Sequence, residues 1–360
     1  MKNTSFVVWD AGDPKGSRAW ISHWESWPGR EVYAHPNYVR LFSDKASRVL
    51  CAAWRSNQGC VLYPFLLRDI AAEPFFGEAP TQAVDIVTPY GYGGPFCWGE
   101  ADPHDLADRF WPAFSEWTSQ QSIVSEFIRF TLFPKDVLDY PGEREEKLTN
   151  VVRNLDIDEE MLWMDYEHKV RKNVQKARRS GVQVEIDPSG ERLDEFLKIY
   201  SGTMDRREAN KGYYFPRRFF ESLQDGLHGQ FAYFHALHEG KVVSTELVLV
   251  STESVYSFLG GTSGEAFDLR PNDLLKHEII LWARKNGKHR FVLGGGYTPE
   301  DGIFRYKKSF APSGCVPFYV GRRVLNPYLY TTLVDTKRRW AREGGTEWGP
   351  RPGYFPDYRA

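Results

Sequence analysis

The alternation of hydrophobic and polar positions predicts a set of elements in the first half of the chain. Apolar runs at 48–55 and 60–67 flank a short polar turn that contains glycine, which predicts a β-hairpin. A helix is predicted over 103–119, because three large apolar residues recur every four positions on one face. A strand over 126–133 completes this set.

The second half repeats this order about 170 residues further on. The predicted elements are strands at 231–237, 241–250 and 254–259, a helix over 272–286 with Asn272 as its N-cap, and a short strand at 290–293. Helices are also predicted over 193–207 and 215–223. The repeated order favours an α/β (α+β) fold of two related units, each a mixed, mostly antiparallel sheet flanked by helices.

Between the halves, residues 165–182 predict a helix with one apolar and one basic stripe. The apolar stripe consists of Tyr166, Val170, Val174 and Ala177, and the basic residues are Lys169, Arg171, Lys172, Lys176, Arg178 and Arg179. No acidic residue occurs between His168 and Val184. Such a surface can contact the phosphates of a tRNA or a nucleotide diphosphate, and the alternative is a solvated helix face.

Composition and charge exclude several classes of protein. The 46 basic and 48 acidic residues give a net charge of −2, which argues against a chain-wide nucleic-acid coat. No apolar run is long enough to span a membrane, and the N-terminal apolar run is too short for a secretory signal. The four cysteines show no CxxC spacing, so we expect reduced thiols and a cytoplasmic protein.

Several catalytic motifs are missing from the sequence. It contains no GxSxG, HExxH or P-loop motif and no histidine and cysteine cluster with metal-ligand spacing. These absences argue against a hydrolase, a metalloprotease or an NTPase. Aromatic residues make up 15% of the chain, which suggests large cores and a ring-lined cleft.

The order of five motifs resembles the FemABX family. They are VRKNVQKARRSGV, IYSGTMDRREANKGYYF, LRPNDLLKHEIILWARKNG, FVLGGG and GIFRYKKSF. The resemblance extends to the GNAT-like acyltransferases associated with bacterial polysaccharide clusters. It implies two tandem GNAT-like domains, which we expect at 1–160, with 315–345 able to complete it, and at 161–314. Residues 341–360 are expected to form an extended tail.

The resemblance implies transfer of an acyl or aminoacyl group to an amine of a cell-wall, sugar-nucleotide or peptide acceptor. The donor is a co-substrate, either aminoacyl-tRNA or acyl-CoA, and no bound cofactor is expected. The stretch Arg270–Leu275 lacks the glycines of the GNAT pyrophosphate loop, which slightly favours aminoacyl-tRNA. Two alternatives stay open: an acetyl-CoA-dependent N- or O-acyltransferase of polysaccharide biosynthesis, and a GNAT-like binding module without turnover.

The resemblance also implies catalytic residues. Tyr306 and Lys307 correspond to the aromatic–lysine pair that the family places beside the reacting carbonyl, where a cation stabilises the oxyanion. The alternative is a solvated basic run at a strand edge. Arg171 corresponds to an arginine that contacts the acceptor's diphosphate. Asp273 and Glu278 are candidates for a general base by location alone.

Several tyrosines are candidates for substrate binding. The loop TPYGYGGP carries Tyr90 and Tyr92 beside three glycines, so that a ligand can approach the backbone and stack on the rings. Tyr38 is expected to line the same cleft, and Tyr213 and Tyr214 to line the acceptor cleft of the second unit. For all five, the alternative is structural packing.

Overall fold

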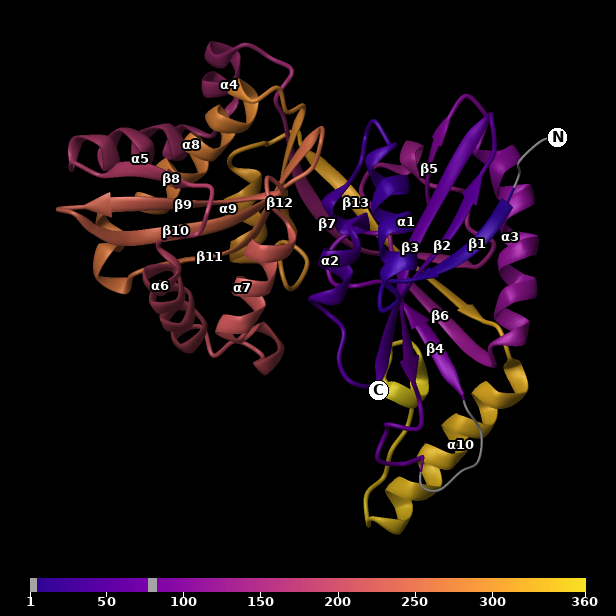
Figure 1. The fold of residues 1–360 in the computed structure, drawn as a ribbon. Helices are drawn as coiled ribbons and strands as arrows, with labels where there is room; N and C mark the ends of the chain where they lie inside the picture. The colour runs from indigo at the N-terminus through magenta and orange to yellow at the C-terminus, as the bar shows by residue number, and fades with distance from the viewer. Residues whose placement is uncertain (1–4, 77–82) are drawn as a thin grey trace. The chain divides into compact units, whose positions relative to one another are not determined.

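The chain divides into two units, each built around its own set of hydrogen-bonded strands (Figure 1). The computed structural model describes residues 5–76 and 83–360. Unit 1 is formed by 1–27, 33–147 and 318–360, and unit 2 by 28–32 and 148–317. Two strands, β7 (Glu143–Asn154) and β13 (Cys315–Val324), each have residues in both units.

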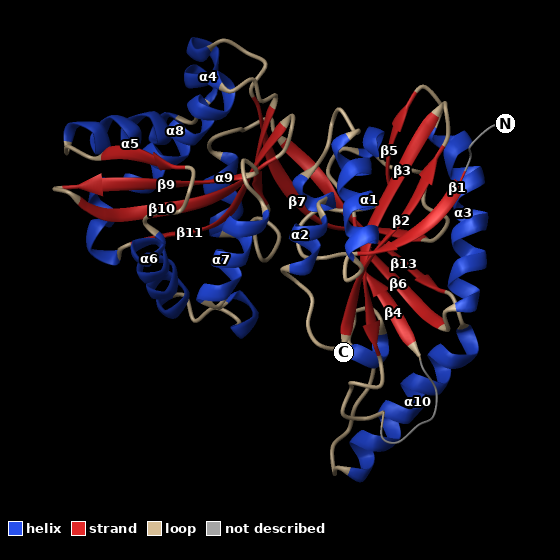
Figure 2. Ribbon diagram, viewed as in Figure 1, coloured by secondary structure: helices blue, strands red, loops and turns tan. Residues whose placement is uncertain are grey.

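In unit 1, helices cover both faces of the sheet (Figure 2). Its other elements are β1 (Ser5–Asp10), α1 (Pro14–Glu25), α2 (Pro36–Arg40), β2 (Ser47–Arg55), β3 (Gly59–Asp69), β4 (Val84–Val87), β5 (Phe96–Gly99), α3 (Pro103–Gln120), β6 (Ile123–Arg129) and α10 (Pro327–Glu343). The strand order is β1-β2-β3-β4-β6-β13, and β5 pairs with β3. All pairs are antiparallel except β4 with β6, which is parallel.

Unit 2 has the same strand order. Its elements are α4 (Glu159–Asp165), α5 (His168–Arg179), β8 (Gln183–Asp187), α6 (Leu193–Arg206), α7 (Arg217–Gly226), β9 (Phe231–His238), β10 (Lys241–Val250), β11 (Ser254–Thr262), α8 (Pro271–Lys285), β12 (Arg290–Gly294) and α9 (Gly302–Lys308). The order is β8-β9-β10-β11-β12-β7, and the parallel pair is again the fourth with the fifth strand, β11 with β12. The repeat of elements predicted from the sequence is confirmed.

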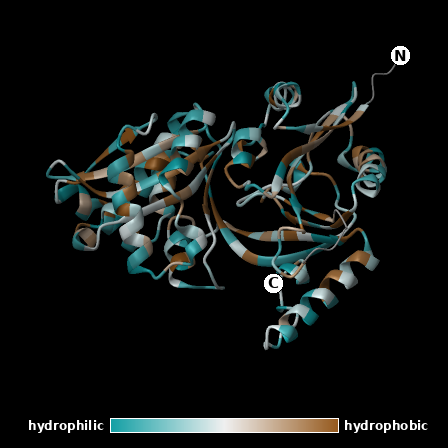
Figure 3. Cartoon of the chain, turned by 60° about the horizontal axis from the view of Figure 1, so that its bottom comes forward, coloured by the Kyte–Doolittle hydropathy of each residue, from teal (hydrophilic) through white to brown (hydrophobic). Residues whose placement is uncertain are grey.

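The alternation of side chains along each strand determines which hydrophobic core each residue joins. In β2, Leu50 and Ala52 pack toward α3, and the intervening Cys51 and Ala53 pack toward α1. In Figure 3, several strands carry hydrophobic stretches, whereas many helices carry both hydrophilic and hydrophobic residues. Central strands such as β3 and β10 are therefore buried on both faces, whereas amphipathic helices such as α5 are buried on one.

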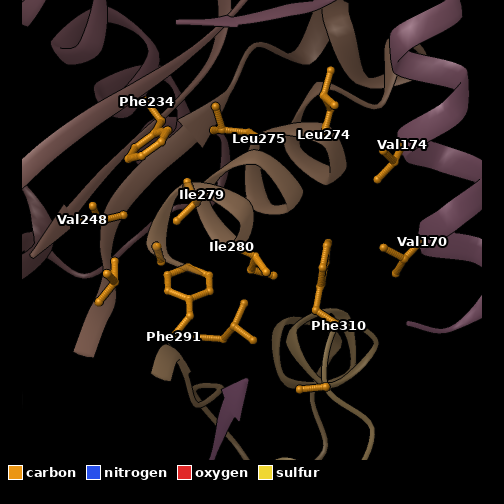
Figure 4. Close-up of a cluster of buried hydrophobic side chains, with 14 of the residues drawn as sticks. Val170, Val174, Phe234, Val248, Leu274, Leu275, Ile279, Ile280, Phe291 and Phe310 are labelled. Carbon is orange, nitrogen blue, oxygen red and sulfur yellow. The ribbon is translucent and has the colours of Figure 1, made fainter. Parts of the chain in front are cut away.

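The predicted basic helix is α5, and it packs by its apolar stripe on α8 (Figure 4). Val170, Val174 and Ala177 are fully buried there. Tyr166 is also buried but lies before the helix begins. Helix α8 begins at Pro271, so Asn272 lies inside its first turn rather than at the N-cap, which is Arg270.

The structure corrects the expected tail. Residues 341–343 belong to α10, and the last residues enter the core of unit 1 rather than lying extended on its surface. The Tyr358 ring is fully buried, and its hydroxyl donates to Asp85 Oδ2 at 3.1 Å. Arg359 donates to the same carboxylate at 2.6 Å, so the tail neutralises a buried charge.

A short segment near the N-terminus, residues 28–32, belongs to unit 2. Glu31 is buried there and accepts a hydrogen bond from the Tyr256 hydroxyl at 2.8 Å. The backbone N–H of Val32 donates to Ser251 Oγ at 2.9 Å. Unit 2 is thus built from two separate segments of sequence.

Candidate functional site

The two parallel strands of unit 2, β11 and β12, separate toward their carboxyl ends, whereas those of unit 1, β4 and β6, stay paired. Strand β12 pairs with β11 from Ser254 to Tyr256, and β11 then continues to Thr262 paired only with β10 in the described chain. In unit 1 the pairing continues past β4, because Thr88 N–H donates to Phe127 O at 3.1 Å and Gly93 bridges Phe130. Groups at the carboxyl end of the separated strands in unit 2 are therefore the candidates for chemistry.

Lys307 lies at this end of the strands. It belongs to α9, a short helix capped by Asp301, whose carboxylate accepts from Phe304 N–H at 2.7 Å. Lys307 Nζ donates to the carbonyl oxygen of Gly295, just beyond β12, at 2.7 Å. Lys307 is thus held at the strand end rather than solvated in a basic run.

The surroundings of Lys307 make it a more acidic ammonium group than usual. Burial, together with the neighbouring Lys276, lowers its pKa to about 8, whereas Glu246 and Asp301 oppose the change. At neutral pH the group is still mostly protonated. A cation with this pKa can donate a proton or a hydrogen bond to a developing negative charge.

Tyr306 lies beside Lys307 but faces α8. Its hydroxyl accepts a hydrogen bond from Asn272 Nδ2 at 2.8 Å. Burial, with the nearby carboxylates of Asp273 and Glu246, raises its pKa well above the ordinary value, so the phenol stays neutral. Tyr306 is positioned as a neutral hydrogen-bonding group next to the lysine.

Three more residues of this cluster were not predicted from the sequence. Lys276 of α8 forms an ion pair with Glu246 of β10 and donates to Ser257 Oγ of β11 at 2.7 Å. Both charged residues are almost fully buried. Their contacts join residues 19 and 30 positions apart in the sequence, and no local pattern indicates such a pair.

The loop between β12 and α9 is shaped by a carboxylate. Asp301 Oδ2 accepts from the backbone N–H groups of Tyr297 at 2.7 Å and Thr298 at 3.2 Å. A Cβ on Gly296 would lie 2.3 Å from Asp301 Oδ1, so this position requires glycine. The loop presents Tyr297, which is 56% exposed and packs edge-on against the Tyr213 ring at 5.8 Å.

Tyr213 therefore lies in the same unit as Lys307. It is beside the loop that begins at Gly295, whose carbonyl oxygen accepts the hydrogen bond from Lys307. Tyr214 is exposed, and its hydroxyl donates to Asp205 Oδ1 at 3.1 Å, so it is directed toward α6. The sequence predicts both tyrosines as candidates but not Tyr297, whose signal is a single aromatic residue after three glycines.

The six basic residues of α5 differ in their surroundings. Lys169 pairs with Glu167 at 3.3 Å, and Arg178 pairs with Glu278 at 2.9 Å. Arg171 donates to the carbonyl oxygens of Met164, at 2.8 Å, and Tyr166, and so closes the end of α4. Lys172, Lys176 and Arg179 are exposed. Arg171 thus has a structural contact, and among the described residues these three cations are exposed without an ion pair.

The two candidates for a general base are engaged with protein groups. Asp273 is buried in the first turn of α8, and its carboxylate accepts from Asn173 Nδ2 at 3.2 Å. Burial raises its pKa. Glu278 is paired with Arg178, as described. Asp273 also places an acidic side chain at the helix N-terminus, where a CoA diphosphate would otherwise be attracted.

The predicted tyrosines of unit 1 form a packed ring cluster. Tyr38 is fully buried, and its hydroxyl donates to Tyr90 O at 2.8 Å, which corrects its expected position lining a cleft. A Cβ on Gly91 would lie 2.4 Å from Tyr33, so this glycine serves ring packing. Tyr92 packs on Tyr33, and Tyr90 is 42% exposed. Of the three, Tyr90 is the most accessible to a ligand.

Within residues 5–76 and 83–360, no group of three or more histidine, cysteine, aspartate or glutamate side chains could hold a metal ion. Over the same residues, no helix is long and apolar enough to cross a membrane.

The fold and the strand separation define a known class of domain. Residues 165–308 match the family model of the acetyltransferase (GNAT) domain. Unit 1 has the same strand order, so the chain consists of two tandem GNAT-like domains.

The chain is also similar in sequence to a curated alanyltransferase. It is 27% identical over 175 residues to UDP-N-acetylmuramoylpentapeptide-lysine N(6)-alanyltransferase of Weissella viridescens. The aligned region covers 47% of this chain and 50% of that protein. The match thus spans about half the length of this relative.

Solved structures show the same fold over most of the chain. FemX has a TM-score of 0.63 at 14% identity, over 88% of this chain and 98% of that chain. A conserved protein from Bacteroides thetaiotaomicron has a TM-score of 0.55 at 10% identity, over 89% and 99%. The resemblance inferred from the five motifs is confirmed.

Proposed function

We propose that this chain is an acyltransferase that moves an aminoacyl group from an activated ester onto an amine of a cell-wall peptide precursor. The observation that carries the proposal is Lys307, held at the end of separated strands in a domain that matches GNAT acetyltransferases. The name of the Weissella relative, an alanyltransferase acting on a muramoylpentapeptide lysine, suggests the acceptor class.

In this mechanism the acceptor nitrogen attacks the ester carbonyl carbon directly. A carbon–nitrogen bond forms and the carbonyl oxygen becomes negatively charged. The ester carbon–oxygen bond then breaks, and the proton that the amine nitrogen loses passes through solvent to the departing hydroxyl oxygen. The Lys307 ammonium group stabilises the oxyanion, and one such donor is worth roughly 3–4 kcal/mol. Binding both substrates in one site supplies much of the remaining acceleration.

We favour aminoacyl-tRNA as the donor. The exposed cations of α5 provide contacts for a phosphate backbone, and the acidic Asp273 occupies the helix N-terminus that a CoA diphosphate would use. The second candidate is an acyl-CoA donor, favoured by the match to the acetyltransferase domain model. The four cysteines are free thiols, which supports a reducing compartment such as the cytoplasm.

A mass-spectrometric transfer assay tests the proposal. The purified protein is incubated with a UDP-linked muramoylpentapeptide and either a pool of charged tRNAs or a pool of acyl-CoAs. We expect the acceptor to gain the mass of one aminoacyl residue with charged tRNA. Product formed only with acyl-CoA would select the second candidate, and no product from either pool with any peptide amine would refute the proposal.

Two variants of α9 give a matched comparison. Lys307→Met removes the ammonium group at Gly295, whereas Lys308→Met removes its neighbour, which lies 5.8 Å over the Phe304 ring. We expect product formation to fall by about 10²-fold or more in the first variant and by less than about threefold in the second.

A further inference from the structure

The buried ion pair of Lys276 and Glu246 has a place in the site that packing alone does not explain. Lys276 lies on α8, Glu246 on β10, and their third partner Ser257 lies on β11 where that strand leaves β12. A buried ion pair contributes little net stability, since desolvation of two charges offsets their attraction. Two apolar side chains would fill the same space at lower cost.

The ion pair and Lys307 lie at the same strand ends: Lys276 contacts Ser257, which directly follows the last β11–β12 pair, and Lys307 contacts Gly295, which directly follows β12. Lys276 and Glu246 are both among the charged groups that influence Lys307, with opposite signs, and Lys276 has the larger effect. The other charge that influences it is Asp301, the cap of its own helix. Asp273 of α8 accepts from Asn173 and acts electrostatically on the neighbouring Tyr306 hydroxyl instead.

We propose that Lys276 is a positioning residue for acyl transfer: held by Glu246 and Ser257, its ammonium group sets the protonation state of Lys307. This inference rests on the proposed function, because it assigns a purpose to the acidity of the oxyanion donor. An acid whose pKa is close to the working pH donates a stronger hydrogen bond to a developing oxyanion. Glu246 and Ser257 fix the second ammonium group so that two cations can share a buried site.

Charge-changing variants distinguish this role from simple packing. Lys276→Gln removes the like charge, so Lys307 should hold its proton to a higher pH, by roughly one pH unit. Glu246→Gln removes the opposing charge and should move the titration of Lys307 to lower pH. Lys276→Arg keeps the cation and should leave the titration of Lys307 near that of the wild type.

Two readouts are needed. The first is an NMR titration of the protein labelled at lysine Cε, with the Lys307 signal identified by its loss in Lys307→Met. The second is the high-pH limb of kcat/KM in the transfer assay. The NMR titration needs no substrate, so it decides the inference about charge even if the transfer assay yields no product.

The proposal is supported if the Lys307 titration and the high-pH limb of kcat/KM both move to higher pH in Lys276→Gln. Both should move to lower pH in Glu246→Gln. Unchanged titrations, or movements in the same direction, overturn it. A titration that moves while the kinetic limb does not also overturn it, because Lys276 then has no part in turnover. If Lys276→Gln does not fold, Glu246→Gln and the uncharged double variant Lys276→Gln/Glu246→Gln, which should titrate slightly above the wild type, decide the same question.

Discussion

Reversal of charge on α5 tests the donor most directly. Of its six cations, Lys169 and Arg178 are paired with glutamates and Arg171 closes the end of α4. This leaves Lys172, Lys176 and Arg179 to meet phosphates. At 0.7–0.9 per contact, three contacts give a salt dependence of log K with a slope of roughly −2.1 to −2.7.

These slopes predict measurable binding curves. Between 50 and 200 mM salt, the affinity of the wild-type protein for tRNA should fall by about 20- to 40-fold. The double variant Lys172→Glu/Lys176→Glu retains one contact of the three, so its affinity should fall by only about threefold over the same range. It should also bind far more weakly at low salt, since each reversal replaces an attraction with a repulsion.

Fluorescence anisotropy of labelled tRNA over this salt range measures both quantities. Lys198→Glu/Lys241→Glu is a matched control, because both lysines are exposed in the same unit but lie off α5. Thermal unfolding should be unchanged in both double variants, because all four residues lie outside the core. A slope that stays at the wild-type value in the α5 variant, or falls equally in the control, would refute the assignment of α5 to the donor.

Four further results are expected. The kcat/KM for transfer should fall tenfold per pH unit above about pH 8, because a rising pH removes the proton from Lys307, whose pKa is about 8; a profile flat to pH 10 contradicts a required ammonium group. Gly296→Ala should lower kcat by up to about 100-fold in steady-state assays, because its Cβ would displace the Asp301 carboxylate; unchanged kcat contradicts this. Tyr297→Ala should raise KM for the acceptor by about tenfold with little change in kcat, whereas Tyr297→Phe should not; equal effects of both variants argue against ring stacking. Ile279→Ala should lower the free energy of unfolding in urea by about 2–5 kcal/mol, and a change below 1 kcal/mol contradicts full burial.

Local periodicity was sufficient to predict much of unit 2. The apolar stripe of α5 and strands β9 to β11 follow directly from spacing in the sequence. Helix α10 was missed because its buried face contains Lys337, which packs inward only because its ammonium group donates to the carbonyl oxygen of Tyr358 at 3.2 Å. Hydropathy assigns such a lysine to the surface.

The candidate site shows the same limit. Lys307 was found through its resemblance to a family motif, but its acceptor at Gly295 and its neighbour Lys276 were not. In the sequence, Lys276 is one polar residue in an amphipathic helix, and only the tertiary fold brings Glu246 and Ser257 to it. Tyr38 was overinterpreted for the opposite reason, because a tyrosine in a loop gives no indication of its burial.

The sharing of β7 and β13 between the two units has a consequence for how the chain folds during synthesis. Unit 2 is complete once residue 317 has emerged, whereas unit 1 must wait for β13 and for the tail that pairs with Asp85. Within unit 2, Val152 N–H donates to Gly314 O at 2.8 Å, which joins the two points where the chain enters and leaves. Folding of unit 2 therefore shortens the loop that unit 1 must close from about 170 residues to a few, and it lowers the entropy cost of that closure. A substitution that unfolds unit 2 restores this cost, so unit 1 depends for its own stability on a domain inserted into it.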